Sequence, residues 1–350
     1  MKIAQISSLM EAVPPKLYGG TERIVAYLTD ELVELGHDVT LFASGDSHTK
    51  GRLEAGWPHA LRLDPDMRDY LAPHVILLEK LARKAHEFDV IHLHVDYLGY
   101  PVLRRTGVPF LATLHGRLDL PELRQVYRTF PDVPVVSISD SQREPMPEAN
   151  YVGTIHHGLP QHLLKPGGGE GGYLAFIGRI SPEKAPDAAI RIAKAAGMKL
   201  RIAAKVDKVD QAYFDRCIKP ALDQPHVEFI GEIDETQKSD FLGKAAGLLF
   251  PIAWREPFGL AMIEAMACGT PVIAMRRGSV PEVIEPGVTG FIVESEEAAV
   301  AAVARLPELD RTRVRERFDA RFTARRMAED YVRLYEHLAV PARTRHFAIA

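Results

Sequence analysis

Cysteine and long apolar runs are the features that this sequence lacks most clearly. Cys217 and Cys268 are the only cysteines in 350 residues, too few for a disulfide framework or a cysteine-based zinc site. No run approaches the ~20 apolar residues that cross a bilayer. Polar side chains interrupt residues 1–6, so this segment predicts a strand rather than a signal peptide. These absences predict a soluble, cytoplasmic protein.

An excess of charge of one sign is also missing. The chain has 43 Lys and Arg against 47 Asp and Glu, a formal net charge of −4, so no overall positive field draws it to nucleic acid or to an anionic membrane. Its hydrophobic content of 46% and charged content of 26% are typical of a globular protein. The length is sufficient for two domains with separate cores.

Short apolar segments alternate with amphipathic ones, which predicts βαβ units and parallel sheets covered on both faces. In the first half we expect strands at residues 2–8, 38–44, 90–94, 110–115 and 135–139, with helices at 19–35 and 74–87. In the second half we expect strands at 173–177, 200–204, 227–230, 247–252, 271–275 and 291–293, with helices at 185–196, 213–222 and 235–246. The glycine-rich residues 166–172 between the halves predict a flexible linker.

One predicted strand-to-helix turn in the second half carries two glutamates. Pro257 suits the first turn of a helix, and Gly269 ends it. Glu256 therefore lies at the mouth of the turn, and Glu264 lies roughly 12 Å further along the helix axis. Glycosidase carboxyl pairs lie about 5 Å or about 6.5–9.5 Å apart. We therefore interpret the two glutamates as contacts to different parts of one long ligand, near a helix N-terminus that favours anions.

The sequence around these glutamates resembles the signature of the family-4 retaining glycosyltransferases of the GT-B fold. The matching residues are Glu256-Pro-Phe-Gly-Leu, Glu264 and the Ala-x-Ala-x-Gly-Thr-Pro-Val that follows it. Three further blocks match in the family's order, at residues 18–23, 176–184 and 278–284. Together the blocks extend over nearly the whole chain.

The resemblance implies an α/β protein with two Rossmann-like domains that face each other across a cleft, and a C-terminal helix that returns to the first domain. We expect residues 1–165 to form the N-terminal, acceptor-side domain, with about 323–350 packing back on it. Residues 166–322 would form the C-terminal domain, which binds the nucleotide sugar.

The resemblance also assigns the donor site. Glu256 would hold the donor sugar with the help of Phe258, Gly259 and Leu260, while Glu264 would hold the ribose. Arg179 and Lys184 would bind the leaving diphosphate, because fixed positive charge offsets the charge that develops as the sugar departs. Gly19 and Gly20 resemble a first-domain loop of the family that approaches the donor phosphates. His115 resembles a histidine that lies near the anomeric centre or the 6-hydroxyl of the donor. These three residues complete the set expected to bind the donor or to act in catalysis.

His94, Asp96 and Glu282 are the candidates for acceptor contacts. The pattern His92-x-His94-x-Asp96 resembles a metallo-hydrolase motif, but Tyr97 stands where that motif needs another histidine. Asp64-Pro65-Asp66 has the Asp-x-Asp form of a manganese site, yet its proline predicts a turn. We expect neither a metal nor a cofactor. Residues 204–208 replace a glycine-rich turn of many relatives, which leaves the preferred base and sugar open.

These residues predict a metal-independent, retaining glycosyltransferase that moves a hexose from a nucleotide-diphospho-sugar, with UDP favoured, to a soluble acceptor hydroxyl. No nucleophilic carboxylate is evident, so retention rests on the resemblance. A small metabolite, a growing polysaccharide and a lipid-linked sugar stay open as acceptors. The alternatives are a GT-B sugar-nucleotide epimerase and a non-catalytic sugar-nucleotide-binding protein. The oligomeric state is not predicted.

Overall fold

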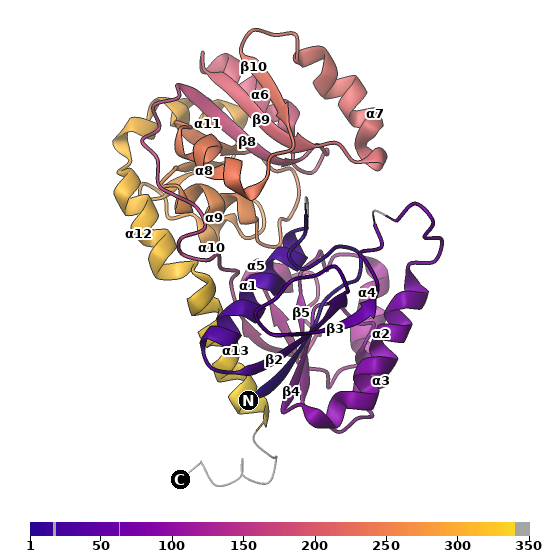
Figure 1. Ribbon diagram of the computed structural model, residues 1–350. Helices are drawn as coiled ribbons and strands as arrows, with labels where there is room; N and C mark the ends of the chain where they lie inside the picture. The colour runs from indigo at the N-terminus through magenta and orange to yellow at the C-terminus, as the bar shows by residue number, and fades with distance from the viewer. Residues whose placement is uncertain (17–18, 63, 340–350) are drawn as a thin grey trace. The chain divides into compact units, whose positions relative to one another are not determined.

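The chain forms two compact α/β units. The structure is a computed structural model that describes residues 1–16, 19–62 and 64–339 (Figure 1). Unit 1 comprises Met1–Gly158 and the C-terminal segment from Ala324, and unit 2 comprises Leu159–Thr323. Tyr18 of the first matching block and the end of the expected 323–350 segment lie outside the described residues. Each unit contains its own sheet, so the predicted α/β class is confirmed.

Unit 1 is built on a parallel sheet with the strand order β3-β2-β1-β4-β5-β6-β7. Its strands are β1 (Lys2–Ile6), β2 (Asp38–Ser44), β3 (Arg52–Trp57), β4 (Val90–Leu93), β5 (Phe110–Leu114), β6 (Val135–Ser137) and β7 (Tyr151–Thr154). Its helices are α1 (Gly20–Glu34), α2 (Leu71–Lys84), η1 (Ala85–Glu87), α3 (Tyr100–Leu103), α4 (Pro121–Thr129), α5 (Asp140–Arg143) and α13 (Ala324–Ala339). Strands β3 and β7 were not predicted, because each has several half-buried positions and lacks a continuous apolar run.

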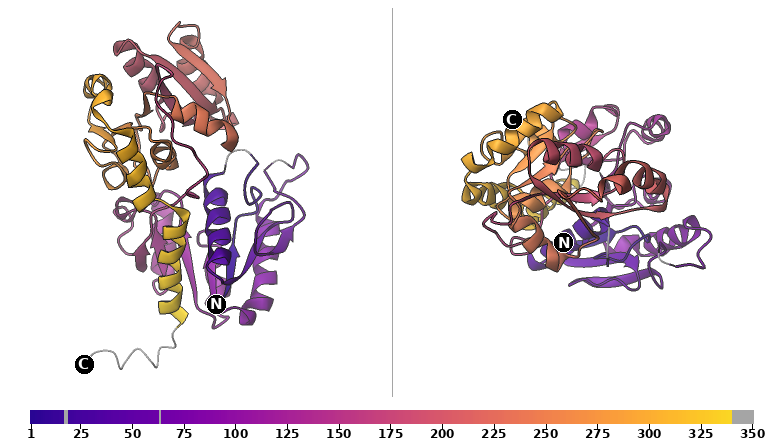
Figure 2. Two further views of the ribbon diagram at one scale, coloured as in Figure 1. Left: turned by 60° about the vertical axis from the view of Figure 1, so that its left-hand side comes forward. Right: turned by 90° about the horizontal axis from the view of Figure 1, so that it is seen from above.

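The two faces of this sheet are covered differently. Because side chains alternate along a strand, Ala4 and Ile6 pack into the apolar core under α2, α3 and α4. The other face is covered by α1 and α13, which run side by side (Figure 2). An ion pair joins them, with Arg325 Nε 2.9 Å from Glu31 Oε2. The terminal helix thus packs on the N-terminal unit, as predicted.

Unit 2 has a parallel sheet in the order β10-β9-β8-β11-β12-β13. Its strands are β8 (Tyr173–Arg179), β9 (Lys199–Lys205), β10 (Val227–Gly231), β11 (Gly247–Phe250), β12 (Val272–Met275) and β13 (Gly290–Val293). Its helices are α6 (Pro186–Ala195), η2 (Lys208–Asp210), α7 (Gln211–Tyr213), η3 (Phe214–Ile218), η4 (Lys219–Ala221), α8 (Glu235–Gly243), α9 (Leu260–Ala267), α10 (Val280–Val283), α11 (Glu296–Ala304), η5 (Leu306–Glu308) and α12 (Arg311–Arg321). The helix predicted at 213–222 is present but is not a regular α-helix: a π-helical and a 3-10 turn follow α7, and Pro220 in the 3-10 turn lacks the N–H that an α-helix would use.

The glycine-rich residues 166–172 are not a linker between the units, which corrects the prediction. Gly167 N donates to Cys268 O at 3.0 Å, and Gly169 N donates to Gly243 O at 2.9 Å. A Cβ on Gly167 would lie 2.5 Å from the carbonyl carbon of Gly243. The guanidinium of Arg311 donates to the carbonyls of Gly167, Gly243 and Ala245. The glycines therefore permit close backbone packing inside unit 2 rather than flexibility.

Candidate functional site

The motif that follows β11 holds Glu256 in a buried ion pair. Lys184, in the loop after β8, donates to Glu256 Oε2, and Trp254 Nε1 donates to the same oxygen at 2.9 Å. The side chains of Lys184 and Glu256 are 21% and 9% exposed, so water screens this pair only in part. Ala253 N also donates to Glu183 O at 2.8 Å, which ties the two loops together at the carboxyl end of the sheet, where ligands of parallel α/β proteins bind.

Residues 278–284 support the Glu256 loop through hydrogen bonds to its backbone, and this support is called the brace. Ser279 N donates to Glu256 O at 3.0 Å, and its buried hydroxyl donates to Phe258 O at 2.7 Å. Gly278 has φ +53, and a Cβ there would lie 2.2 Å from Glu256 O. The brace requires glycine, because only a residue without a side chain fits so close to that backbone.

The N-terminus of α9 begins directly after this loop. Gly259 is its N-cap, with φ 82 in the left-handed region, and Leu260 is its first residue. The ring of Phe258 is buried and packs edge-on against Phe322, with centroids 6.2 Å apart. Phe258 thus anchors the loop through its buried ring. Met262 N donates to Gly259 O at 3.0 Å, and the N–H groups of Leu260 and Ala261 before it have no acceptor within the helix.

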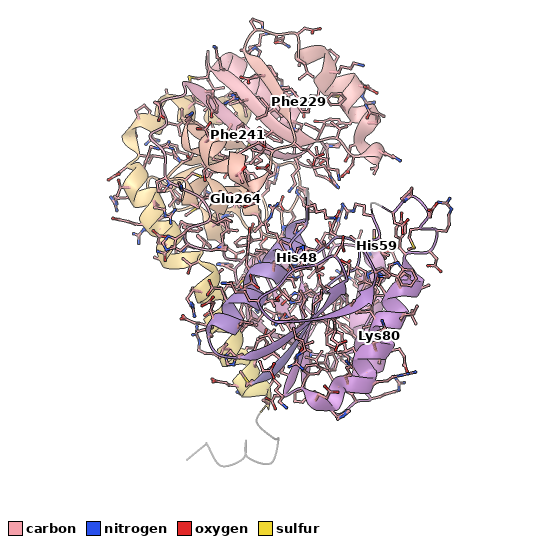
Figure 3. The ribbon with its side chains drawn as sticks, in the orientation of Figure 1. His48, His59, Lys80, Phe229, Phe241 and Glu264 are labelled. Atoms are coloured by element: carbon pink, nitrogen blue, oxygen red, sulfur yellow. The ribbon has the colours of Figure 1, made fainter. Side chains whose placement is uncertain are left out.

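Glu264, the second glutamate of the motif, is held by a lysine that the sequence analysis missed. Lys238 Nζ lies 2.6 Å from Glu264 Oε1 and 2.7 Å from Glu235 Oε1. Lys238 belongs to α8. Glu264, which is labelled in Figure 3, belongs to α9. The Lys238 and Glu264 side chains are each 6% exposed. The available signal was a lysine spaced three and four residues before the buried Phe241 and Leu242, which places it on the inner face of the helix.

Arg179, the other predicted cation, already has two acidic partners in unit 2. Its NH2 group donates to Glu183 Oε2 at 2.9 Å, and its Nε lies 3.3 Å from Asp210 Oδ2. Asp210 belongs to η2 (Lys208–Asp210), just after residues 204–208, which replace the glycine-rich turn of many relatives. The carboxylate that pairs with Arg179 thus comes from the turn that follows β9.

In unit 1, the half-buried His115 directly follows β5 and contacts the buried rings of two other histidines. His94 Nδ1 is 2.9 Å from His115 Nε2, and the His157 ring stacks on His115 with centroids 5.2 Å apart. Burial lowers the pKa of His115 to about 3. Burial also lowers the pKa values of His92, His94 and His157, and the neighbouring histidines lower them further. All four rings are therefore neutral near pH 7.

The remaining candidates are dispersed. Gly19 and Gly20 begin α1 in unit 1, where a Cβ on Gly19 would lie 2.8 Å from Pro15 Cβ, so close packing already requires this glycine. Asp96 is exposed and has φ 47. Glu282 belongs to α10 in unit 2, where its carbonyl accepts from Arg321.

Both ring nitrogens of His94 are occupied, by His115 and by Gln5 Oε1 at 2.7 Å. This leaves His94 no nitrogen for an acceptor, so its expected acceptor contact is corrected to a role inside the protein.

The two sequence patterns that resemble metal sites, at residues 64–66 and 92–96, are hydrogen-bonded within the protein. Asp64 Oδ1 accepts from Asp66 N at 2.9 Å, which forms the predicted turn. His92 bonds to Thr113 and Tyr335. Among residues 1–16, 19–62 and 64–339, no group of three or more His, Cys, Asp or Glu side chains is arranged to hold a metal ion.

Two family models match the chain. One, described as Glycosyl transferases group 1, matches residues 167–322, and the other, Glycosyltransferase Family 4, matches residues 18–138. This chain belongs to glycosyltransferase family 4. The matches divide as the fold does, with one model in each unit.

Individual relatives agree with this assignment. D-inositol 3-phosphate glycosyltransferase of Mycobacterium tuberculosis is 26% identical over 289 residues, 69% of this chain and 60% of the relative. The chain thus spans 60% of the length of that curated relative.

Two solved structures share the fold. Sucrose-phosphate synthase from Thermosynechococcus elongatus superimposes with a TM-score of 0.79 at 20% identity, covering 96% of this chain and 98% of that one. Anabaena HepE in complex with UDP-glucose superimposes with a TM-score of 0.75 at 17% identity, covering 97% and 100%. These likenesses confirm the GT-B fold. No helix in the described part of this family-4 chain is both long and apolar enough to cross a membrane.

Proposed function

We propose that this protein is a retaining glycosyltransferase that moves a hexose from a UDP-sugar to a hydroxyl group of a soluble acceptor without a metal ion. The observation that carries the proposal is the Lys184–Glu256 pair beside the N-terminus of α9. The pair sets a buried carboxylate, which accepts hydrogen bonds from sugar hydroxyls, next to an ammonium group, which binds phosphate oxygens. A nucleotide sugar presents those two chemistries side by side.

The charges in unit 2 match the parts of such a donor. The Lys184 ammonium has three N–H donors, of which Glu256 accepts one, so it can bind a diphosphate while the pair stays intact. The first N–H groups of α9 add a positive dipole end. Glu264, fixed by Lys238, offers carboxylate oxygens that suit the paired hydroxyls of a ribose.

The proposed reaction breaks the bond from the sugar C1 to the diphosphate oxygen and forms a bond from C1 to the acceptor oxygen on the same face. The acceptor proton passes to the departing phosphate oxygen, and UDP leaves. Lys184 and the helix N-terminus offset the negative charge that grows on the diphosphate, the kind of fixed electrostatic stabilisation that lowers a transition-state barrier. The relatives' names support a glycosyltransferase, and the UDP-glucose bound to Anabaena HepE supports the donor class.

A thermal-shift series with UDP-glucose, UDP-galactose, UDP-N-acetylglucosamine, GDP-mannose and ADP-glucose tests the donor. A ligand present at about 100 times its Kd stabilises the folded state by about 2.7 kcal/mol, so one UDP-sugar should raise Tm by several degrees. A Glu256→Gln variant is the matched control, because it keeps the size of the side chain and removes its charge. No change in Tm with any nucleotide sugar would overturn the proposal.

Turnover is tested by UDP release with a panel of polyol and sugar acceptors, and the anomer of the product is assigned by NMR. We expect the donor configuration in the product and equal rates with and without EDTA. An inverted product would refute retention, and inactivation by EDTA with rescue by Mn²⁺ would refute metal independence.

A further inference from the structure

A continuous chain of hydrogen bonds runs through the polar face of the unit 1 sheet and ends at His115. Gln5 Nε2 donates to Tyr335 Oη at 3.0 Å, and Gln5 Oε1 lies 2.7 Å from His94 Nε2. His94 Nδ1 in turn lies 2.9 Å from His115 Nε2. Gln5 and His94 are 0% and 4% exposed, so water does not compete for these bonds.

The chain determines where each histidine carries its proton. An amide oxygen only accepts, so His94 must donate from Nε2, and its neutral ring then has a lone pair on Nδ1. His115 must therefore donate from Nε2 to that lone pair. His115 Nδ1 is therefore unprotonated. This atom is buried and has no hydrogen-bond partner among the described residues.

The opposite direction of the chain is less favourable. If the amide of Gln5 were turned, His94 would carry its proton on Nδ1 and His115 would carry its proton on Nδ1 too. That would bury an N–H donor without an acceptor, and orphaned buried N–H groups are rarer and more costly than unused lone pairs.

We propose that Gln5 and His94 are positioning residues that hold His115 in its Nε2–H tautomer, so that His115 Nδ1 can only accept a hydrogen bond. A neutral ring with this tautomer can orient a hydroxyl group. It cannot donate through Nδ1 or supply a positive charge. The role of His115 in a glycosyl transfer reaction rests on the proposed function, whereas the tautomer belongs to the ligand-free protein.

The tautomer is read directly from long-range ¹H–¹⁵N correlation spectra of ¹⁵N-histidine-labelled full-length protein at pH 7. The chain has 14 histidines, so His115 is assigned by its absence from the spectrum of a His115→Asn variant. We expect a signal of an unprotonated Nδ1 and of a protonated Nε2. A predominant Nδ1–H tautomer in the wild-type protein would overturn the proposal even if no variant folds.

Variants at Gln5 separate positioning from a merely structural role. In Gln5→Met, His94 loses its acceptor, and the Nδ1–H population of His115 should rise by about 2- to 10-fold, the weight of one hydrogen bond. Gln5→Glu keeps an acceptor oxygen and should restore the tautomer. Tyr335→Phe removes the partner of Gln5 Nε2 but leaves the His94 branch in place, and should not change His115.

Turnover with UDP-glucose gives the second readout. Gln5→Met should lower the rate of UDP release while UDP affinity stays within about twofold of the wild type, because the UDP site proposed above lies in unit 2. A wild-type tautomer in Gln5→Met would overturn the positioning role. Failure of the wild-type protein to bind UDP would instead count against the proposed function and leave the tautomer result intact.

Discussion

Substitution of Gly278 by alanine tests whether the second-unit site depends on its brace. Gly278 has no side chain that could contact the donor, but its Cα lies against the backbone of the loop that carries Glu256. A Cβ would lie 2.2 Å from Glu256 O and 2.5 Å from Glu256 N. The effect of Gly278→Ala on Glu256 would therefore be transmitted entirely through the backbone.

The size of the effect follows from these distances. Ordinary contacts of a Cβ begin at 3.4 Å, so one of the two backbones must move by about 1 Å. A misplacement of about 1 Å near reacting groups can cost about 10²-fold in rate. The alanine also takes a positive φ, which costs about 1 kcal/mol of folding stability. We expect kcat/KM for UDP-glucose to fall about 10²-fold.

Gly287→Ala is the matched control. Gly287 also has a positive φ, +76, but a Cβ there has no atom within 4 Å. Both variants should lose stability in urea titrations, Gly278→Ala at least as much as Gly287→Ala because of its close contacts, while only Gly278→Ala should lose turnover in a UDP-release assay and affinity for UDP-glucose in calorimetry. Equal activities of the two variants would refute the reasoning that the brace places Glu256.

Three further predictions concern charges. Lys184→Met should slow UDP release by about 10²–10³-fold, and Lys184→Arg should recover part of it, because a fixed cation offsets the diphosphate charge; full activity of Lys184→Met would exclude that role. Lys238→Met should reduce the preference of the protein for UDP over 2′-deoxy-UDP in calorimetry, because Glu264 loses the partner that holds it, whereas the exposed Lys244→Met should not; an unchanged preference would refute the ribose assignment. The four clustered histidines described above, three of them buried and His115 half-buried, should make the fold acid-labile. Their pKa values are lowered in the folded state, to about 3 for His115, so the unfolded chain binds protons first as the pH falls below about 6.5. Each ring then costs up to about 1.4 kcal/mol of folding stability per pH unit. Urea titrations at pH 7.5 and 5.5 measure this loss.

The acid-lability prediction has its own control. His48 and His59 are exposed (Figure 3), so a variant that replaces both with asparagine should show the same loss of stability between the two pH values. Disappearance of the loss in that variant would show that exposed histidines cause it.

Local sequence was sufficient for most of the strands and for several helices, but it did not predict α4, α11 or α12. Apolar runs with regular spacing located β2, β8 and α13, and the glycines and prolines around residues 255–271 located the turn before α9. These signals work because hydrophobic periodicity and the backbone preferences of glycine and proline act within a few residues. The same reasoning failed for residues 166–172, because glycine permits both flexibility and close backbone packing, and tertiary contacts with Gly243, Cys268 and Arg311 decide between them.

Only the tertiary structure determined the partners of the site residues. Through its resemblance to the family, the sequence predicted that Glu256, Glu264, Lys184 and Arg179 belong to one site. It did not show that Lys184 pairs with Glu256 across 72 positions or that Lys238 holds Glu264. The sequence suggested that His94 contacts a ligand. The structure shows instead that His94 Nε2 bonds to Gln5, which lies 89 positions away. The physical reason is that buried charges and polar rings need partners, and the parallel sheets supply those partners from strands and helices that are distant in the sequence.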